Sequence, residues 1–259
     1  MPSPKSKSNS PRLRNAEASR ATILEHAIAE FARQGIAGAR TASIADAAKV
    51  NKALIYYYFK DKQSLYTASL QAVVGGLAES VLPMLQSSLS PGEKVLRLAR
   101  SHFEYLLGNP NYRLFMQQEL SRTRGTGQPS SDFLAIGKSH FAPLHEAGLR
   151  TVREGIASGE FRKMESNGTF NMIVGMNVFY FMSAPIVRAL RGIDPFAPDS
   201  VRHHVAASLD FIAASLFTNR EEGIKLAKKI AAGFAVRRPK SATPQSATKF
   251  SNKAARATS

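Results

Sequence analysis

Residues 41–65 of the chain read TASIADAAKVNKALIYYYFKDKQSL and carry the clearest structural pattern in the sequence. This stretch has the dimensions of two short helices joined by a tight turn, with a third helix beginning behind them. Ile44 and Ala48 give the first short helix a one-turn apolar stripe. Thr41 and Asn51 are typical N-caps for the first and the second short helix. The spacing predicts a helix-turn-helix.

The start of the second short helix carries residues suited to contacting DNA bases. In a helix-turn-helix the N-terminal residues of the second helix meet base edges in the major groove. Lys52 can donate to guanine acceptors, and Ala53 or Leu54 can contact a thymine methyl group. A small three-helix unit with ordinary surface lysines has the same spacing, so the spacing alone leaves both interpretations open.

Three adjacent tyrosines, Tyr56, Tyr57 and Tyr58, follow within one turn of this helix. They cannot all enter a core this small, so we expect one or two of them to be exposed. An exposed Tyr hydroxyl can bind a phosphate. Lys62 lies in the first turn of the next helix, where Asp61 is the expected N-cap and free backbone N–H groups already favour an anion.

The rest of the chain also shows helical periodicity. We expect helices over residues 20–35, 41–48, 51–59, from 61 to about 83, from 90 onward, and over 109–120, 132–158, 168–191 and 199–217. Residues 121–131 are rich in Gly, Ser and Pro and are expected to form a loop. No apolar/polar alternation is sustained between turn signals, so no strand is predicted. The predicted fold is all-α.

The net charge of +16 lies mostly at the two ends of the chain. Residues 1–20 carry a net +4 and residues 219–259 a net +8, whereas the predicted helix-turn-helix is nearly balanced. A strongly basic protein favours nucleic acid or an anionic surface as a partner. The composition of residues 1–19 and 237–259 predicts disordered basic arms. A further amphipathic helix is possible over residues 219–236.

The run from Arg20 to Leu70 resembles the DNA-binding domain of the tetracycline-repressor (TetR-like) family of bacterial transcription regulators. The segment YYYFKDKQSLY, residues 56–66, is close to the most recognisable string of that family. The matching residues are Ile23, Ala27, Phe31, Gly35, Thr41, Ile44, Ala45, Ala48, Val50, Lys52, Ile55, Tyr56, Tyr57, Phe59, Lys62 and Leu65. The resemblance implies an N-terminal three-helix helix-turn-helix domain in residues 20–66. It also implies a C-terminal helical domain in residues 67–218 that binds an effector and forms a dimer.

The same resemblance implies which residues contact DNA. Those at or near bases are Lys52, Ala53, Leu54 and Tyr56, and those that hold phosphates are Thr41, Tyr57, Tyr58 and Lys62. Two positions depart from the family pattern. Lys49 occupies the turn position where Gly is usual, and a turn with positive φ would favour Gly. Leu54 stands where a small hydroxyl residue is common, which weakens any assignment of a hydrogen bond from this position to a base.

Two segments near the C-terminal end suit a dimer interface. Residues 168–191 are apolar nearly all round, and a soluble helix of this pattern must be covered on most sides. Residues 199–217 carry an apolar stripe made of Val201, Val205, Leu209, Ile212 and Leu216. Two such helices from each subunit would form an isologous four-helix interface.

A membrane span is the competing interpretation of residues 168–191, because about 20 apolar residues suffice to cross a bilayer. Asn171 and Asn177 fall inside this segment, and buried Asn side chains are costly in lipid. No stretch near the N-terminus resembles the apolar region of a signal peptide. We therefore expect a cytoplasmic protein without a membrane partner.

Bulky apolar residues in the C-terminal half are the candidates for an effector pocket. They are Phe103, Leu106, Phe115, Met116, Phe141, Leu144, Phe179 and Met182. Gln117, Glu119, His140 and His145 could supply polar contacts. Filling the core is the alternative role for most of these aromatic residues. The expected effector is an unidentified, mainly apolar small molecule.

The sequence contains no pattern typical of an enzyme or of a metal site. It has no Cys, and its six His residues stand at no recognised metal spacing. No G-x-S-x-G, P-loop or G-x-G-x-x-G pattern occurs. We therefore expect no catalytic residues, no cofactor and no metal.

The expected function is transcription regulation by a homodimer that binds a palindromic double-stranded DNA operator and is released by a small-molecule effector. Repression is the commoner mode in the resembled family, and activation stays open. The alternative is a sequence-independent, architectural DNA-binding protein with basic arms. Affinity for an operator-like palindrome and for random DNA separates the two, because non-specific binding is essentially electrostatic.

Overall fold

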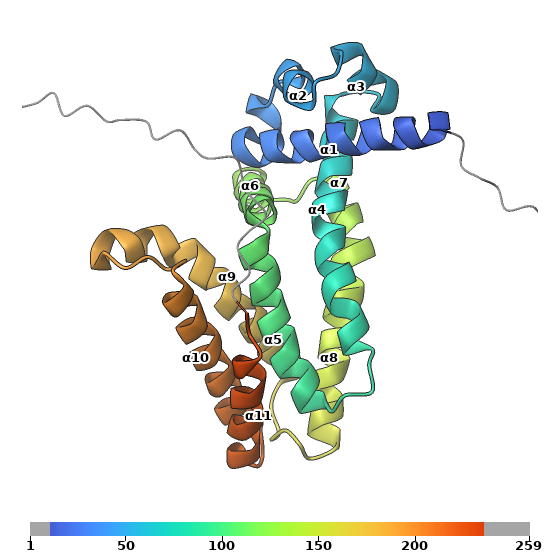
Figure 1. Cartoon of the computed structure of the whole chain (residues 1–259). Coiled ribbons are helices and arrows are strands. Elements are labelled where there is room, and N and C mark those ends of the chain that lie inside the picture. Colours follow the sequence, from blue (N-terminus) through green and yellow to red (C-terminus); the bar gives the residue numbers. More distant parts are fainter. Residues whose placement is uncertain (1–10, 236–259) are drawn as a thin grey trace, which may run out of the picture.

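The structure is a computed structural model that describes residues 11–235 (Figure 1). Its helices are α1 (Pro11–Gly38), α2 (Thr41–Ala48), α3 (Lys52–Tyr58), α4 (Lys62–Leu85), α5 (Pro91–Gly108), α6 (Pro110–Thr126), α7 (Ser131–Ile136), the π-helical turn η1 (Gly137–Phe141), α8 (Ala142–Ala157), α9 (Ser166–Arg191), α10 (Pro198–Leu216) and α11 (Arg220–Ala232). Within the described range there is no β-strand, and one isolated antiparallel bridge joins Phe161 to Phe217. The predicted all-α fold is confirmed.

Helices α1, α2 and α3 form a small unit at one end of the molecule (Figure 1). This unit packs on the first turns of α4, which then continues into the C-terminal half and runs beside α5 and α8. Helices α9, α10 and α11 pack against α5. One long helix, α4, therefore belongs to both halves of the chain.

Helix α1 begins at Pro11, so the expectation of a disordered arm is wrong for residues 11–19. Pro is tolerated in the first turn of a helix because its missing N–H would have no partner there. The residues that follow include Arg, Leu, Ala and Glu, which are good helix formers. The predicted stop at Gly35 is confirmed by its φ of 65°, which interrupts the helical backbone. The arms expected at residues 1–10 and 237–259 lie outside the described residues.

An apolar core runs without interruption from the helix-turn-helix into the C-terminal half. Phe31 of α1, Tyr66 of α4 and Phe115 of α6 meet in it and are almost fully buried. The ring centroids lie 5.1 Å apart for Phe31 and Tyr66, and 5.6 Å apart for Tyr66 and Phe115. The two halves therefore pack as one body across the start of α4. A second buried cluster joins α5, α9, α10 and α11.

Two predicted segments in the middle of the chain need correction. Helix α6 runs to Thr126, so the loop expected over residues 121–131 is limited to residues 127–130. The helix expected over residues 132–158 is present as α7, η1 and α8, with a π-helical turn at Gly137–Phe141. Pro143 follows this turn and has no N–H for the carbonyl four residues earlier, so the regular α-helical ladder is broken there.

The three C-terminal helices are α9, α10 and α11. The further helix predicted after residue 218 exists as α11, and its N-cap Asn219 accepts a hydrogen bond from the Glu222 N–H at 3.3 Å. The stripe expected to form a dimer interface is buried inside the subunit, and its residues are Val201, Val205, Leu209, Ile212 and Leu216. That expectation is wrong because α5 and α11 cover this face of α10.

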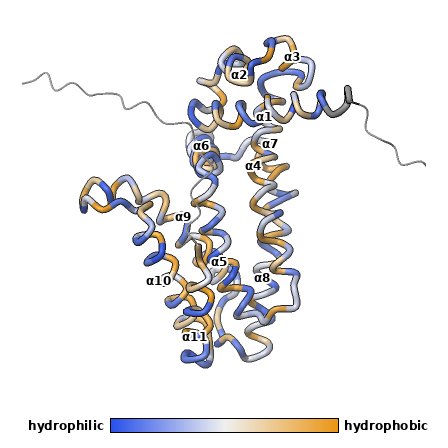
Figure 2. Tube along the Cα trace, viewed as in Figure 1, coloured by the Kyte–Doolittle hydropathy of each residue, from blue (hydrophilic) through white to orange (hydrophobic). Residues whose placement is uncertain are grey.

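The exposed apolar residues lie elsewhere on α9 and α10. Figure 2 shows how apolar residues predominate along α9. Phe179, Ile186 and Leu190 of α9 have exposed fractions of 69%, 61% and 82%, and Phe211 of α10 is 64% exposed. Large exposed apolar areas usually mark an interaction surface. Among the described helices, α4 and α9 are also long and apolar enough to cross a membrane.

Candidate nucleic-acid interface and ligand cavity

The turn between α2 and α3 uses the left-handed backbone conformation. Lys49 has φ 56° and ψ 41°, and it is the one non-Gly residue with positive φ among residues 11–235. Its N–H bonds the carbonyl of Asp46, and the Val50 N–H bonds the carbonyl of Ala45 at 3.0 Å, as in a Schellman motif. Lys49 thus adopts the conformation that Gly would adopt without strain. The predicted N-cap Asn51 is confirmed, since its side chain accepts from the Ala53 N–H at 2.9 Å.

The outward side of α3 displays part of the predicted DNA-contacting set. Lys52 and Ala53 are exposed, and Leu54 is partly buried against the core. Tyr57 is 79% exposed and Tyr56 is 43% exposed. The Lys52 ammonium lies over the Tyr56 ring, 5.9 Å from its centroid. An ammonium and an aromatic ring therefore form one exposed surface on the first turns of α3.

Tyr58 is the tyrosine that turns inward. It packs partly buried against the core, and its ring meets that of Tyr57 edge-on with centroids 5.1 Å apart. The expectation that not all three tyrosines enter the core is confirmed.

Thr41 is not an N-cap, so that expectation is wrong. It is the first residue of α2, and the N-cap position belongs to Arg40. The Thr41 hydroxyl instead lies 3.2 Å from the Tyr56 hydroxyl, which holds Tyr56 in place across the two helices. The start of α2 is stabilised by Glu30, a residue that sequence reasoning missed. Its buried carboxylate accepts from the Arg40 N–H at 3.3 Å, beside the positive end of the helix dipole.

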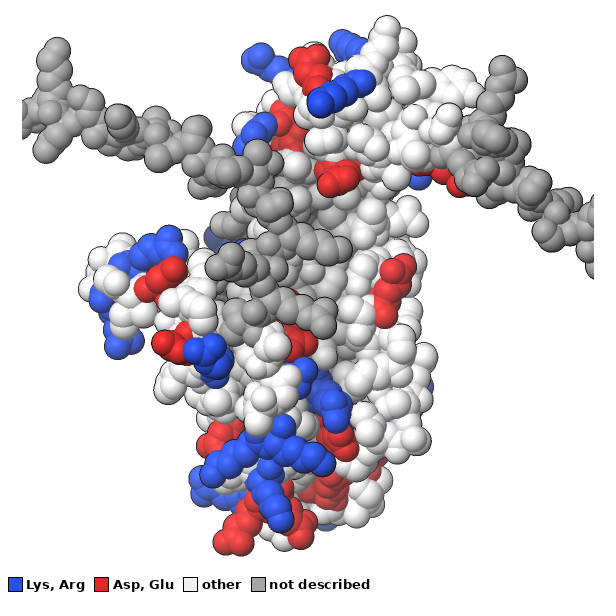
Figure 3. Space-filling view, in the orientation of Figure 1, with Lys and Arg blue, Asp and Glu red and all other residues white. Residues whose placement is uncertain are grey.

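Lys62 lies where α4 begins, next to the helix-turn-helix. The predicted N-cap Asp61 is confirmed, because its carboxylate accepts from the Ser64 N–H at 2.7 Å. This hydrogen bond lowers the pKa of Asp61. The Lys62 ammonium reaches the carbonyl of Ala37 at 3.4 Å. Figure 3 shows basic side chains at both ends of the molecule, around the helix-turn-helix and over α11.

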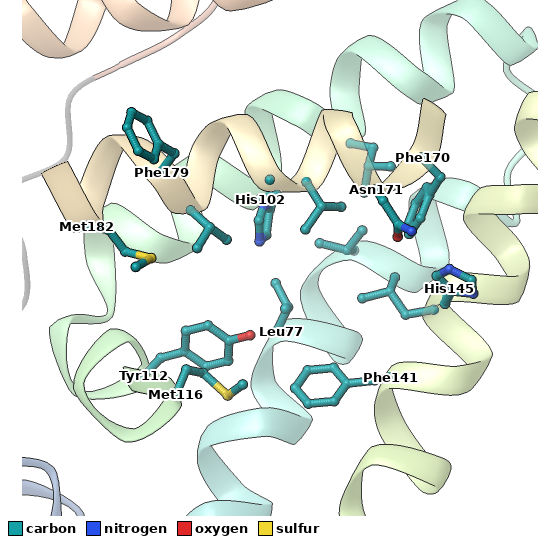
Figure 4. A pocket seen from close by; sticks show the side chains of 16 residues that line it. Leu77, His102, Tyr112, Met116, Phe141, His145, Phe170, Asn171, Phe179 and Met182 are labelled. Atoms are coloured by element: carbon teal, nitrogen blue, oxygen red, sulfur yellow. The ribbon is translucent and has the colours of Figure 1, made fainter. Parts of the chain in front are cut away.

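A cavity of about 550 Å³ lies between α9 and the helices α4, α5, α6 and α8 (Figure 4). Its lining is Leu77, Val81, Leu98, His102, Tyr112, Met116, Phe141, Leu144, His145, Phe170, Asn171, Val174, Gly175, Val178, Phe179 and Met182. None of these lining residues is Asp, Glu, Lys or Arg. Cavities of this size, mostly apolar with a few polar groups, are typical ligand sites.

The structure brings only part of the predicted pocket residues to this cavity. Those that line it are Met116, Phe141, Leu144, Phe179 and Met182. Phe103, Leu106 and Phe115 do not line it and are buried instead, with at most 3% of each residue exposed. Phe103 packs among the rings of Tyr180, Phe181 and His204, and so fills the second core cluster. Helical periodicity marks these residues as apolar without indicating which of them faces an empty space.

Three polar residues of the cavity escaped sequence reasoning, His102, Tyr112 and Asn171. His102 is a buried residue of α5, and its Nδ1 lies 3.3 Å from Nδ2 of Asn177 on α9. Burial lowers the pKa of His102 to about 4, so this imidazole is neutral at physiological pH. Tyr112 of α6 is 7% exposed, and burial raises the pKa of its hydroxyl. The side chains of His102 and Tyr112 point into the cavity in Figure 4.

Of the four residues predicted to supply polar contacts in the pocket, one lines the cavity and three lie elsewhere. His145 lines the cavity, with its ring edge-on to Phe170 at 5.1 Å. His140 lies outside the lining, against Gly75 of α4, and its buried Nε2 has no hydrogen-bond partner among the described residues. Gln117 is exposed. Glu119 is fully buried but serves the packing of α6 against α4.

Helix α6 connects the cavity wall with the helix-turn-helix. The Tyr66 hydroxyl of α4 donates to Glu119, and Arg122 donates to the same carboxylate at 2.8 Å. Burial and the Glu119 carboxylate together raise the pKa of Tyr66. Gln118 donates to the carbonyl of Ala32 in α1 at 2.6 Å. The neighbouring residues Gln118 and Glu119 of α6 thus contact α1 and α4, respectively.

Within residues 11–235, no group of three or more His, Asp or Glu side chains is arranged to hold a metal ion.

Comparison with known proteins bears directly on the N-terminal unit. Residues 23–68 match the sequence profile of the bacterial regulatory proteins of the tetR family. The N-terminal unit is thus similar in sequence to the DNA-binding domain of tetR-family regulators. The chain is 50% identical over 68 residues to the HTH-type transcriptional repressor SCO4008 of Streptomyces coelicolor. That match covers 26% of the chain and 35% of SCO4008, about a third of its length.

Longer matches extend the similarity into the C-terminal half. The chain is 24% identical over 184 residues to the HTH-type transcriptional repressor NicS of Pseudomonas putida, which covers 71% of the chain and 85% of NicS. The solved structure of the ketosteroid transcriptional regulator KstR2 of Mycobacterium tuberculosis superposes with a TM-score of 0.60 at 19% identity. This superposition covers 77% of the chain and 95% of KstR2, and it shows a shared fold.

Proposed function

We propose that the protein is a homodimeric transcriptional repressor that binds a palindromic operator through α3 of each subunit and is released by a small-molecule effector. The observation that carries the proposal is the exposed first turn of α3, fixed by the Asn51 cap at the free end of the molecule. In helix-turn-helix proteins this turn contacts base edges. Relatives named as transcriptional repressors support the same function.

The exposure of each side chain suggests its role on DNA. Lys52 and Ala53 are proposed to face the bases, together with Tyr56, whose hydroxyl is held by Thr41. Leu54 is partly buried, so it contacts a base edge with part of its side chain at most.

Tyr57 and Lys62 are the best-placed phosphate ligands. Tyr57 is largely exposed, and Lys62 adds charge at the N-terminus of α4. Tyr58 is partly buried and Thr41 is buried, so their contribution to phosphate binding is smaller. Thr41 acts mainly by positioning Tyr56.

The exposed apolar faces of α9 and α10 are proposed to form the dimer interface. Phe179, Ile186, Leu190 and Phe211 would remain in water in a monomer, at a considerable hydrophobic cost. A two-fold axis near these helices buries the same residues from both subunits. A membrane span is the competing use of α9. A preparation that stays dimeric without detergent excludes it and supports a cytoplasmic protein.

The cavity is proposed to hold the effector. Leu77 and Val81 place α4 in the cavity wall, and the same helix begins at the helix-turn-helix. A ligand that shifts α4 or α6 would change the distance between the two recognition helices. These helices must lie about 34–36 Å apart to enter successive major grooves, so a change of a few ångströms weakens operator binding.

The deciding experiment compares DNA affinities at physiological salt. One duplex carries the inverted repeat upstream of the protein's own gene, and the other has the same composition in shuffled order. A regulator of this kind binds the operator at least about 10³-fold more tightly. Equal affinity for both duplexes would overturn the proposal and favour the architectural alternative, whose binding is electrostatic and falls steeply with salt.

A further inference from the structure

The cavity contains a histidine whose proton position is fixed by its neighbours. Asn177 Nδ2 donates to the carbonyl of Ala99 at 2.8 Å and lies 3.3 Å from His102 Nδ1. The opposite orientation of this amide would place its oxygen against the Ala99 carbonyl, so the NH₂ group must occupy this position. An NH₂ group can only donate. His102 Nδ1 is therefore the acceptor.

The tautomer of His102 follows from this hydrogen bond. A neutral imidazole carries one proton, and because Nδ1 accepts, the proton is on Nε2. Protonation of Nδ1 would set two donors face to face, which adds to the effect of burial in keeping the ring neutral. Nε2 lies on the far edge of the ring from Cβ, and Figure 4 shows the ring extending into the cavity. His102 thus presents a fixed, uncharged N–H donor to the cavity.

The remaining lining sets limits on what this donor can bind. Tyr112 points into the same space from α6, opposite His102 on α5 (Figure 4). No Asp, Glu, Lys or Arg lines the cavity, so an ionic group there would lose its hydration without gaining a counter-charge. A fully apolar ligand would leave the His102 N–H without a partner, which is also costly.

We propose that the cavity takes an uncharged, largely apolar ligand with one hydrogen-bond acceptor, such as a ketone or ester carbonyl, and that His102 Nε2 donates to this acceptor. Tyr112 supplies a second donor to the same oxygen. This inference rests on the proposal that the cavity is the effector site. It adds the chemical class of the ligand and the residue that recognises it.

His145 is the cavity residue that would favour a different class of ligand, a carboxylate. It lies on α8 with its ring edge-on to Phe170, and an imidazole N–H can also donate to a carboxylate. It is less buried than His102, and no hydrogen bond holds its ring among the described residues. A carboxylate probe must therefore be part of the test.

The experiment measures binding of four matched probes to the full-length protein, by calorimetry or competition, without DNA. Benzophenone, diphenylmethane, diphenylacetate and the benzhydrylammonium ion share two phenyl rings on one carbon and differ in the group that carbon bears. We expect benzophenone to bind most tightly. His102→Phe should weaken benzophenone binding about tenfold while changing diphenylmethane binding much less, and Tyr112→Phe should weaken it by a smaller factor.

A measurement on the wild-type protein keeps the test independent of the folding of these variants. Spectra of protein labelled with ¹⁵N-histidine report which ring nitrogen carries the proton, and we expect Nε2–H for His102 with a shift on adding benzophenone. A proton on Nδ1 overturns the inference. So do equal affinities for benzophenone and diphenylmethane, tighter binding of either charged probe, or no binding of any probe. Operator preference is measured separately, and its loss would refute the proposed function whatever the probes do.

Discussion

The side-chain amide of Gln118 lies 2.6 Å from the carbonyl oxygen of Ala32, so α6 is hydrogen-bonded to the first helix of the DNA-binding unit. The same helix places Tyr112 and Met116 in the cavity wall. Gly35, which ends the regular part of α1, allows this approach. A Cβ there would stand 2.7 Å from the Gln118 side-chain oxygen. The cavity and the DNA-binding unit thus contact neighbouring turns of one helix.

Replacing Gln118 tests whether this hydrogen bond transmits ligand binding. We expect Gln118→Ala to leave ligand affinity unchanged and to reduce the ligand-induced loss of operator affinity by about 1 kcal/mol, the usual size of such couplings. Operator affinity with and without ligand gives the coupling directly. Gln117→Ala, at the exposed neighbouring position, is the matched control. If ligand lowers operator affinity equally in the wild type and in Gln118→Ala, the hydrogen bond from Gln118 to Ala32 does not transmit ligand binding to the DNA-binding unit.

The phosphate assignments predict a change in salt dependence. We expect the double variant Tyr57→Ala, Lys62→Ala to bind operator and random DNA more weakly by a similar factor, and to lower the slope of log affinity against log salt by about 1. Titrations at several salt concentrations measure both quantities. Lys60→Ala, which replaces an exposed lysine between α3 and α4, is the comparison. An unchanged slope in the double variant would show that neither side chain meets a phosphate.

The left-handed backbone conformation of Lys49 suggests that a glycine at this position would stabilise the protein. The positive φ of Lys49 strains a residue with a Cβ, so Lys49→Gly should raise the free energy of unfolding by about 1 kcal/mol, or roughly 3 °C in melting temperature. Lys60→Gly is the matched control, because Lys60 is exposed and its φ is not positive. It should leave stability unchanged or lower it. A loss of stability in Lys49→Gly would mean that the lysine side chain makes a contact that outweighs the backbone strain.

The buried imidazole of His102 predicts loss of stability in acid. Its pKa is lowered to about 4 in the folded protein, whereas an unfolded chain has the ordinary value near 6.5. Between these values the unfolded chain binds more protons, so the free energy of unfolding rises with pH across this window, by about 3 kcal/mol in total. Urea unfolding at pH 4.5 and pH 7 measures the effect, and His102→Gln should reduce it.

A control for this pH effect is at hand on α10. His203 is exposed, so His203→Gln should change the pH dependence of the wild type much less than His102→Gln does. The neighbouring His204 also has its pKa lowered to about 4, by burial and by His203, and contributes in the same direction. Stability that does not fall below pH 6.5 would contradict the buried, neutral state of both rings.

The exposed apolar face predicts how to separate the subunits. In a two-fold interface each substitution is present twice, so Phe211→Lys should place two like charges where apolar contacts are needed. We expect the dimer dissociation constant to rise by at least about a hundredfold. Sedimentation without detergent gives the oligomeric state. Leu120→Lys, on an exposed residue of α6, should leave the wild-type assembly intact. A dimeric Phe211→Lys would place the interface elsewhere.

The features that the sequence predicted well are those that depend on near neighbours. Asn51 and Asp61 cap α3 and α4 by bonding N–H groups only two or three residues away, so residue type and spacing suffice to find them. The predicted N-cap role of Thr41 is wrong because its hydroxyl contacts that of Tyr56, fifteen residues further on. Local residue spacing cannot reveal such a partner.

The less predictable features depend on how helices pack. Periodicity identifies the apolar stripe from Val201 to Leu216 but does not indicate which element covers it, so the sequence alone suggests a dimer interface there. In the folded chain α11 returns to cover this face, and Phe211 lies outside it. His102 was passed over for a similar reason. A single His on a helix gains its significance only when Asn177 fixes its proton and an empty space lies beside it.

Helix α9 serves two surfaces with the same residues. Phe179 and Met182 line the cavity, yet they are 69% and 60% exposed in the single subunit. A second subunit resting on α9 would close this side of the cavity to water, so dimerisation and ligand binding are thermodynamically linked. Dilution should then weaken the apparent affinity for the ligand. A cell would consequently set its sensitivity to the effector partly through the amount of regulator that it makes.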